Sequence, residues 1–206
     1  MELTLEILLD AAELNIEKGF AGPDKEERAQ KALQLAQAAY DLDQNHPRTN
    51  LILATSYHCN QRYQEALPLY QRSLEIDATN TTTLSNYGMA LMHLRGKDNW
   101  QKAEELFTEA QKLEPRNGVR DYFLGQMNEA RKIPDTALKF YKTAKEKLET
   151  TKRNRNLNLE ESTFLLNTIE AIDRITVHLH SRSPFEFPIG LDEEGRMRYH
   201  NPGIMI

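Results

Sequence analysis

Small side chains recur along this sequence at a nearly constant spacing, and this recurrence limits the available folds more than any other feature. The first series of equivalent positions is Ala32, Ala66, Ala103 and Ala137, with steps of 34, 37 and 34 residues. Four residues after the last three of these alanines stand aromatic rings: Tyr70, Phe107 and Tyr141. Residues four apart lie on one face of an α-helix. The chain is therefore expected to consist of copies of one helical unit.

A second series locates the additional three residues. Ala54, Gly88 and Gly125 are separated by steps of 34 and then 37 residues. The insertion therefore falls between Gly88 and Ala103, and the polar segment 95–100, which contains a glycine, is predicted to absorb it as a loop. An accidental amphipathic bundle is the competing interpretation, but helical periodicity alone does not fix the positions of loops.

The fullest copy of the pattern lies between Thr81 and Asn117. Its characteristic residues are Leu84, Tyr87, Gly88, Leu91, Ala103, Phe107, Ala110 and Pro115. This order of large, small and proline positions resembles the tetratricopeptide repeat, in which each unit is a pair of antiparallel helices. The resemblance implies an all-α fold: a short right-handed solenoid of helical hairpins with a C-terminal capping helix and an irregular tail.

The same columns divide the chain into a solenoid at 1–180 and an extended tail at 181–206. A degenerate leading repeat is expected at 3–45, and three clearer repeats are expected at 47–80, 81–117 and 118–150. In the leading repeat, an amphipathic helix ends at Gly19, and Asp24 is placed to cap the next helix.

Residues 159–180 are predicted to form the capping helix. Their apolar side chains fall close to one stripe: Leu165, Ile169, Ile172, Ile175 and Leu179. A terminal repeat exposes an apolar face that needs a cover, so capping is the favoured interpretation. A dimerisation face is the alternative.

Three residues make local predictions. Pro68 is expected near the first turn of its helix, where backbone amides lack helical partners and proline is tolerated. Asp135 is expected to be a helix N-cap. Glu149 stands where proline would normally end the repeat, so that helix is expected to continue further.

Composition narrows the function classes. The net charge of −5 disfavours a nucleic-acid partner. The single cysteine, Cys59, excludes an intrachain disulfide and suits a reducing compartment. No apolar run is long enough for a membrane span, and the amino terminus is acidic where a signal peptide is basic. A cytoplasmic protein is the resulting expectation.

The sequence offers no pattern typical of an enzyme, a cofactor site or a metal site. It has no glycine-rich phosphate loop or nucleophile elbow, and its six histidines are scattered. His178 and His180 are two residues apart on a predicted helix, so their side chains point in different directions and cannot share an ion. Catalytic residues, cofactors and metals are therefore expected to be absent.

The resemblance also implies which residues line a concave groove, because first helices form that face in this family. The columns implied from the repeat at 47 are Arg48, Leu51, Ile52, Thr55 and His58. Those from the repeat at 81 are Ser85, Asn86, Met89, Met92 and His93. Those from the repeat at 118 are Tyr122, Phe123 and Gln126. Some family members bind acidic chaperone tails through a clamp of lysines, asparagines and an arginine, but only Asn86 matches that clamp.

This groove would be apolar and rich in methionine, which suits a peptide or helix with an apolar segment. The sequence therefore predicts non-enzymatic protein binding by an adaptor or assembly subunit. The alternative is a chaperone that shields an apolar client segment before assembly or secretion. The tail is unusually apolar for a disordered segment, so it is expected to dock, on its own solenoid or on a partner. Its candidate docking residues are Phe185, Phe187, Ile189 and Tyr199.

Overall fold

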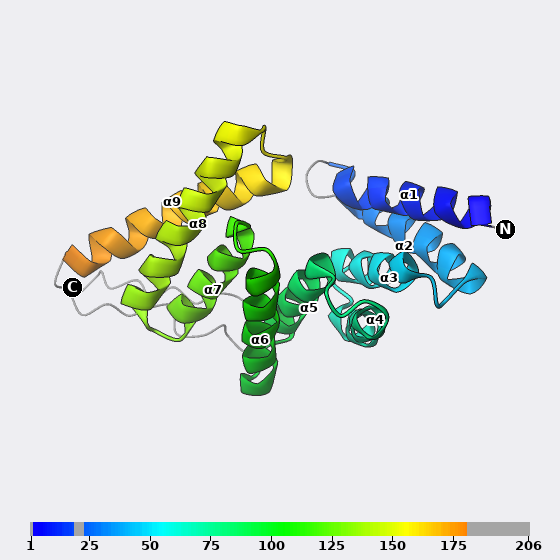
Figure 1. The fold of residues 1–206 in the computed structure, drawn as a ribbon, viewed down its shortest axis with the longest axis horizontal. Coiled ribbons are helices and arrows are strands. Elements are labelled where there is room, and N and C mark those ends of the chain that lie inside the picture. Colours follow the sequence, from blue (N-terminus) through cyan, green and yellow to red (C-terminus); the bar gives the residue numbers. More distant parts are fainter. Residues whose placement is uncertain (1, 19–22, 181–206) are drawn as a thin grey trace, which may run out of the picture. The chain divides into compact units, whose positions relative to one another are not determined.

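The computed structural model describes residues 2–18 and 23–180, and all regular elements in these residues are α-helices (Figure 1). They are α1 (Glu2–Lys18), α2 (Lys25–Leu42), α3 (Pro47–Cys59), α4 (Tyr63–Ile76), α5 (Thr81–Leu94), α6 (Lys97–Leu113), α7 (Gly118–Ala130), α8 (Pro134–Asn154) and α9 (Leu159–His180). The predicted all-α fold is confirmed. Among the described helices, none has the length and apolarity that a membrane crossing requires. Gly19 and the tail from 181 lie outside the described residues.

The chain forms two compact units. Unit 1 ends at Glu114 and contains α1 to α6; unit 2 begins at Pro115 and contains α7 to α9. In unit 1, α1 packs on α2, α3 on α4 and α5 on α6; in addition, α2 packs on α3 and α4 packs on α5. The first helices contact their neighbours in turn, α1 with α3 and α3 with α5. In unit 2, α9 packs on α8 and also contacts α7.

The repeated glycines allow each hairpin to close around a large ring. A Cβ atom at Gly88 would lie 2.8 Å from Cζ of Phe107, and one at Gly125 would lie 2.7 Å from Cδ1 of Tyr141. Real Cβ atoms essentially never approach other heavy atoms so closely. The first and second helices can therefore pack at this distance only because glycine occupies the first-helix position that faces the aromatic ring.

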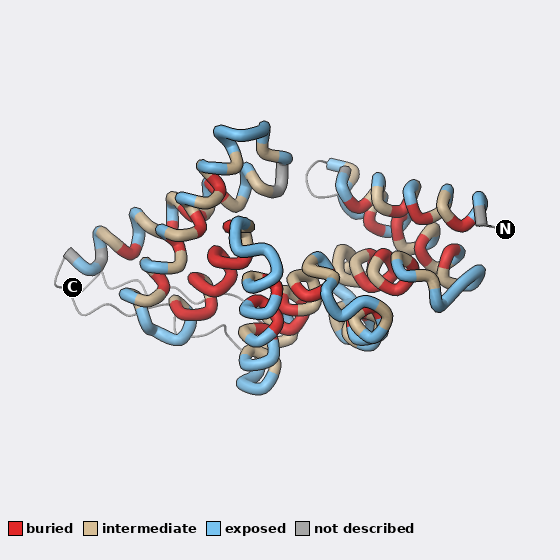
Figure 2. Tube along the Cα trace, in the orientation of Figure 1, coloured by how far each residue is buried: buried red, intermediate tan, exposed pale blue. Residues whose placement is uncertain are grey.

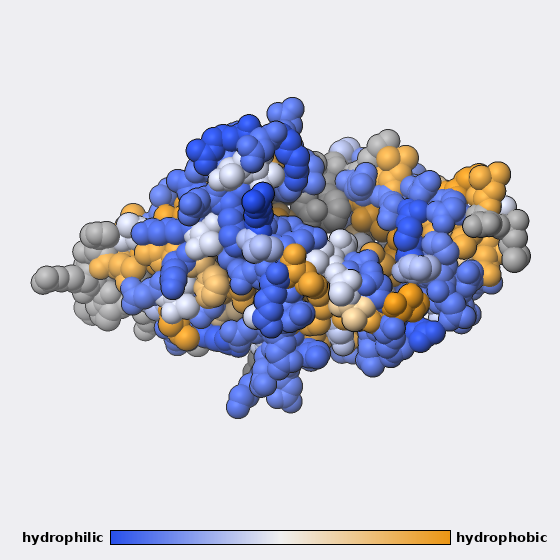
Figure 3. Space-filling view, viewed as in Figure 1, coloured by the Kyte–Doolittle hydropathy of each residue, from blue (hydrophilic) through white to orange (hydrophobic). Residues whose placement is uncertain are grey.

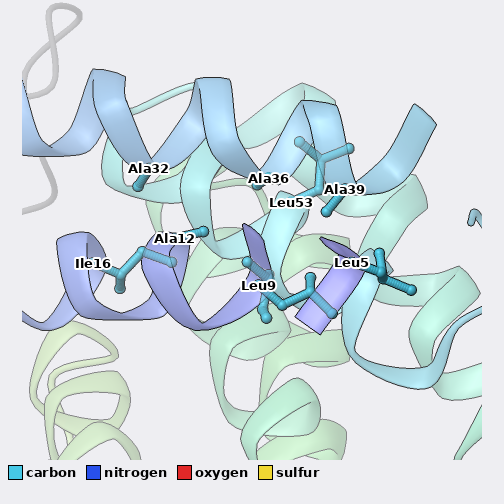
Figure 4. Packing of buried hydrophobic residues seen from close by; sticks show 9 residues of the cluster. Leu5, Leu9, Ala12, Ile16, Ala32, Ala36, Ala39 and Leu53 are labelled. Atoms are coloured by element: carbon cyan, nitrogen blue, oxygen red, sulfur yellow. The ribbon is translucent and has the colours of Figure 1, made fainter. Parts of the chain in front are cut away.

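In the leading repeat, alanines take the place of the glycine and aromatic pair and let the two helices approach closely. Leu5, Leu9, Ala12 and Ile16 of α1 are buried against the small residues of α2 (Figure 4). Those small residues are Ala32, Ala36 and Ala39, each fully buried. Buried residues accordingly follow the inward faces of both helices (Figure 2). Close helix approach through alanine explains how this repeat packs without the aromatic residues of the later copies.

The predicted loop insertion is wrong: the three additional residues lie in a helix. Gln61, Arg95 and Lys132 occupy equivalent loop positions and all have positive φ angles of 58° to 62°. The second helix begins two residues later in every repeat, but α6 has 17 residues where α4 has 14. Because three residues are close to one helical turn, α6 gains length before Ala103 while its buried face stays nearly in line.

Two predicted N-caps differ in detail. Asp24 precedes α2, but its carboxylate accepts a hydrogen bond from Arg28 Nε at 2.8 Å and caps no backbone amide. Asp135 is not an N-cap: Ile133 holds that position, Pro134 opens α8, and Asp135 lies in the first turn. Proline is well suited to the first helical position, and the helix therefore starts two residues earlier than predicted.

Pro68 lies deeper in its helix than predicted. It is the sixth residue of α4, inside the helix. Because proline has no N–H, the carbonyl of Gln64 receives no helical hydrogen bond from this position. At the other end of the chain, α8 continues past Glu149 to Asn154, as the missing proline predicted.

Candidate partner-binding surface

In unit 1, two neighbouring first helices present half-buried side chains from the predicted columns. The amide of Asn86 on α5 donates to Thr55 Oγ1 on α3 at 3.3 Å. Thr55 in turn donates to the carbonyl of Leu51 at 2.8 Å, and Ser85 donates to the carbonyl of Thr81 at 2.7 Å. We call this the α3–α5 surface, defined by Leu51, Thr55, Ser85, Asn86, Met89 and Met92, all of intermediate exposure.

One end of the α3–α5 surface is closed by aromatic rings. His58 Nδ1 lies 3.3 Å from Tyr70 Oη, within hydrogen-bond distance. The Tyr63 ring stacks on His93, with centroids 4.6 Å apart and planes 8° from parallel. His58 meets both of these rings edge-on, with centroid distances of 5.1 Å to Tyr63 and 5.6 Å to His93. These contacts fix the orientation of both histidine rings.

The surroundings of this aromatic cluster favour the uncharged forms of its two histidines. Burial lowers the pKa of His58 to about 4, and the neighbouring His93 adds a smaller effect in the same direction. Burial also lowers the pKa of His93 and raises the pKa of Tyr70. A neutral, apolar end of the surface favours an apolar side chain of a ligand over a charged one.

Replacing His58 by glutamine is expected to remove part of the acid sensitivity of unit 1. The pKa of histidine is about 6.5 when unfolded and about 4 here, so the stabilisation is fully present above pH 6.5 and is lost as the pH falls towards 4. Between pH 7.5 and pH 5 the wild type should lose about 2 kcal/mol more than the His58→Gln variant. Urea unfolding at both pH values measures this; equal losses would contradict the assignment.

Arg48 and Ile52 of α3 were predicted to line the groove, but both interact with α1 instead. The Arg48 guanidinium pairs with three carboxylates of α1: Glu6 at 2.6 Å, Asp10 at 2.8 Å and Glu13 at 2.6 Å. Ile52 is 2% exposed and belongs to the core shared with α1 and α2. The repeat pattern did not predict the pairing of Arg48 with α1, although the spacing of the three acidic residues places them on one side of that helix.

In unit 2, α9 covers the predicted aromatic residues. Tyr122 and Phe123 are buried, and each ring centroid lies 5.3 Å from that of Phe164 on α9. Gln126 is half-buried and donates to Tyr122 Oη at 2.8 Å.

Hydrogen bonds to Glu129 also connect the helices of unit 2. Arg174 of α9 donates to both carboxylate oxygens of Glu129 on α7, at 2.7 and 2.9 Å. Tyr141 on α8 donates to the same carboxylate at 2.8 Å. The three helices of unit 2 are therefore joined at the half-buried carboxylate of Glu129. Among the described side chains, no group of three or more His, Cys, Asp or Glu is arranged to hold a metal ion. Phe185, Phe187, Ile189 and Tyr199 lie outside the described residues.

No protein-family model matches the sequence, and no curated protein matches it significantly. Solved structures do match. A crystal structure of MamA protein superposes with a TM-score of 0.57 at 16% identity, covering 90% of this chain and 97% of that one. MamA 41-end from Desulfovibrio magneticus RS-1 gives a TM-score of 0.57 at 11% identity, covering 87% and 97%. Yeast Tom70 gives 0.63 at 17% identity, covering 86% of this chain and 34% of Tom70.

These likenesses establish the fold. Both MamA and Tom70 are built from tetratricopeptide repeats, and the aligned regions include most of the chain described above. The chain therefore has the tetratricopeptide-repeat type of fold, an all-α helical solenoid.

Proposed function

We propose that this chain is a non-enzymatic protein-binding module, an adaptor or assembly subunit that takes a peptide or helix on the α3–α5 surface. The observation that carries the proposal is the arrangement of Asn86, Thr55 and the two methionines on adjacent first helices. The Asn86 amide is one hydrogen-bonding group that a bound backbone can use. Met89 and Met92 supply apolar contacts that adapt to different side chains.

The buried and ion-paired residues limit the proposal to part of the predicted groove. Ile52, Tyr122 and Phe123 are buried, and Arg48 is engaged by three carboxylates. The proposed contacts are therefore Leu51, Thr55, Ser85, Asn86, Met89 and Met92, bordered by His58 and His93. The relatedness in fold to MamA and Tom70 supports an interaction role, since both are repeat scaffolds.

Affinity capture of the tagged full chain with quantitative mass spectrometry tests this proposal. We compare the wild type with an Asn86→Ala/Met89→Glu double variant, which removes the amide and places a charge on the surface. Thr108→Glu is the matched control, because Thr108 is exposed on α6 and belongs to none of the predicted columns. Thermal unfolding verifies that all three proteins are folded.

The expected result is a partner recovered with the wild type and the control, and reduced at least tenfold with the double variant. Equal recovery with all three proteins would contradict the proposal. A partner recovered in a stable stoichiometric ratio supports an adaptor or subunit, whereas rapid exchange supports the chaperone alternative.

A chain truncated after Ser181 tests the proposed tail docking. Greater binding without the tail would mean that the tail occupies the α3–α5 surface, and lost binding would mean that the tail itself contacts the partner.

A further inference from the structure

Helix α1 carries two apolar faces on nearly opposite sides. Its inner face is buried in unit 1 through Leu5, Leu9, Ala12 and Ile16. Its outer face holds Leu3, Ile7 and Leu14, which are 75%, 59% and 47% exposed. At about 100° per residue, these three outer side chains fall within roughly 40° of one another and almost opposite the inner face. Figure 3 shows apolar surface over this helix.

A helix with apolar residues on two sides is typical of one that is buried on two sides. The described residues of unit 1 cover only the inner face, as the exposed fractions of the outer residues show. Single exposed apolar residues need no explanation, but three in one stripe over about three turns form a continuous contact strip. We call Leu3, Ile7 and Leu14 the outer strip of α1.

The charge beside the outer strip determines which kind of partner surface can bind there. The sequence of α1 contains five carboxylates and one lysine. Glu6, Asp10 and Glu13 pair with one guanidinium, that of Arg48, and Glu6 also lies 3.2 Å from Nε2 of His46, so negative charge remains in excess on that flank. Glu17 on the same flank is exposed. An opposing surface that carries positive charge is favoured here, and one that carries negative charge is repelled.

This charge argues against two other occupants. Pairing α1 with α1 of a second copy would bring two acidic flanks together. An anionic membrane would be repelled for the same reason. We propose that the outer strip of α1 is a second docking surface, which binds a basic amphipathic helix of a partner protein. The strip spans about 16 Å, which matches anchors spaced over three turns of such a helix. The proposal depends on α1 alone and not on the α3–α5 surface.

A designed probe tests the proposal on the full chain. The probe is a fluorescent 18-residue peptide of leucine and lysine, patterned as an amphipathic helix, and its counterpart carries glutamate in place of lysine. Binding is followed by fluorescence anisotropy for the wild type and for an Ile7→Ser/Leu14→Ser double variant. Because both positions are exposed, the variant should unfold at the wild-type temperature. Leu166→Ser/Val177→Ser is the matched control, since these α9 residues are 57% and 70% exposed.

The wild type is expected to bind the lysine peptide at least tenfold more tightly than the glutamate peptide. The α1 double variant should lose at least tenfold in affinity, whereas the α9 control and the Asn86→Ala/Met89→Glu variant should bind like the wild type. Glu17→Gln should weaken binding about twofold to fivefold, and added salt should act in the same direction.

Four results would overturn the proposal. The first is equal affinity for the two peptides, and the second is unchanged affinity in the α1 double variant. The third is an alternative occupant: either a dimer in sedimentation analysis that the Ile7→Ser/Leu14→Ser change abolishes, or binding to phosphatidylserine vesicles that the same change abolishes. Loss of binding in the Asn86→Ala/Met89→Glu variant alone would assign the peptide to the α3–α5 surface and also reject the outer strip.

Discussion

Replacing Phe107 by alanine is expected to lower the free energy of unfolding of unit 1 by about 3–5 kcal/mol. The Phe107 ring is fully buried, and it lies directly over Gly88, which has no side chain to move into the vacated space. The cavity therefore stays largely open, and the neighbouring side chains lose their contacts with the ring.

Urea denaturation followed by circular dichroism measures this change. Leu113→Ala on the same helix is the matched control, because Leu113 is 41% exposed and its truncation should cost less than about 1 kcal/mol. If the Phe107→Ala variant lost no more free energy of unfolding than this control, the ring would not be the main packing contact of its hairpin. The packing described for the repeat would then be incorrect.

Replacing Gly125 by valine is expected to destabilise unit 2 by about 3 kcal/mol, the upper part of the range for an overpacked core. The new Cβ would lie 2.7 Å from two carbon atoms of the Tyr141 ring. Tyr141 is 1% exposed and its hydroxyl is held by Glu129, so the ring cannot move aside without breaking that hydrogen bond.

The repeat at 47 provides a control for this substitution. Ala54 holds the same column and already places a Cβ atom in the core beside Tyr70. Ala54→Gly should therefore cost only about 1 kcal/mol, from the lower helix propensity of glycine. Thermal and urea unfolding compare both variants with the wild type. A Gly125→Val protein as stable as the wild type would show that this column does not limit helix approach.

Residue spacing was sufficient to predict the helical hairpins, because the alanine, glycine and aromatic columns report where two helices must approach each other. It could not decide where the three additional residues lie. A longer loop and a longer helix give the same distance between Gly88 and Ala103, and only the structure shows that α6 is extended. Pro68 was misplaced for a related reason, since no residue marks the start of α4 strongly: its N-cap, Arg62, makes no side-chain cap bond.

The candidate site was harder to predict than the fold. A column assigns a residue to a helix face, but what covers that face depends on elements far away in the sequence. Arg48 meets carboxylates that lie 35 to 42 residues earlier in the chain. Tyr122 is covered by Phe164, a residue of the terminal helix. The sequence predicts that α1 is amphipathic, but only the exposed fractions show that Leu3, Ile7 and Leu14 stay uncovered by the described residues.

Photo-crosslinking tests whether the partner binds on the α3–α5 surface. A benzophenone amino acid is placed at Met89 in one full-length protein and at Thr108 on α6 in another, and each is irradiated with the partner obtained by affinity capture. We expect a crosslink to that partner from position 89 and none from position 108. A crosslink from position 108 without one from position 89 would contradict the claim that the partner binds on the first helices.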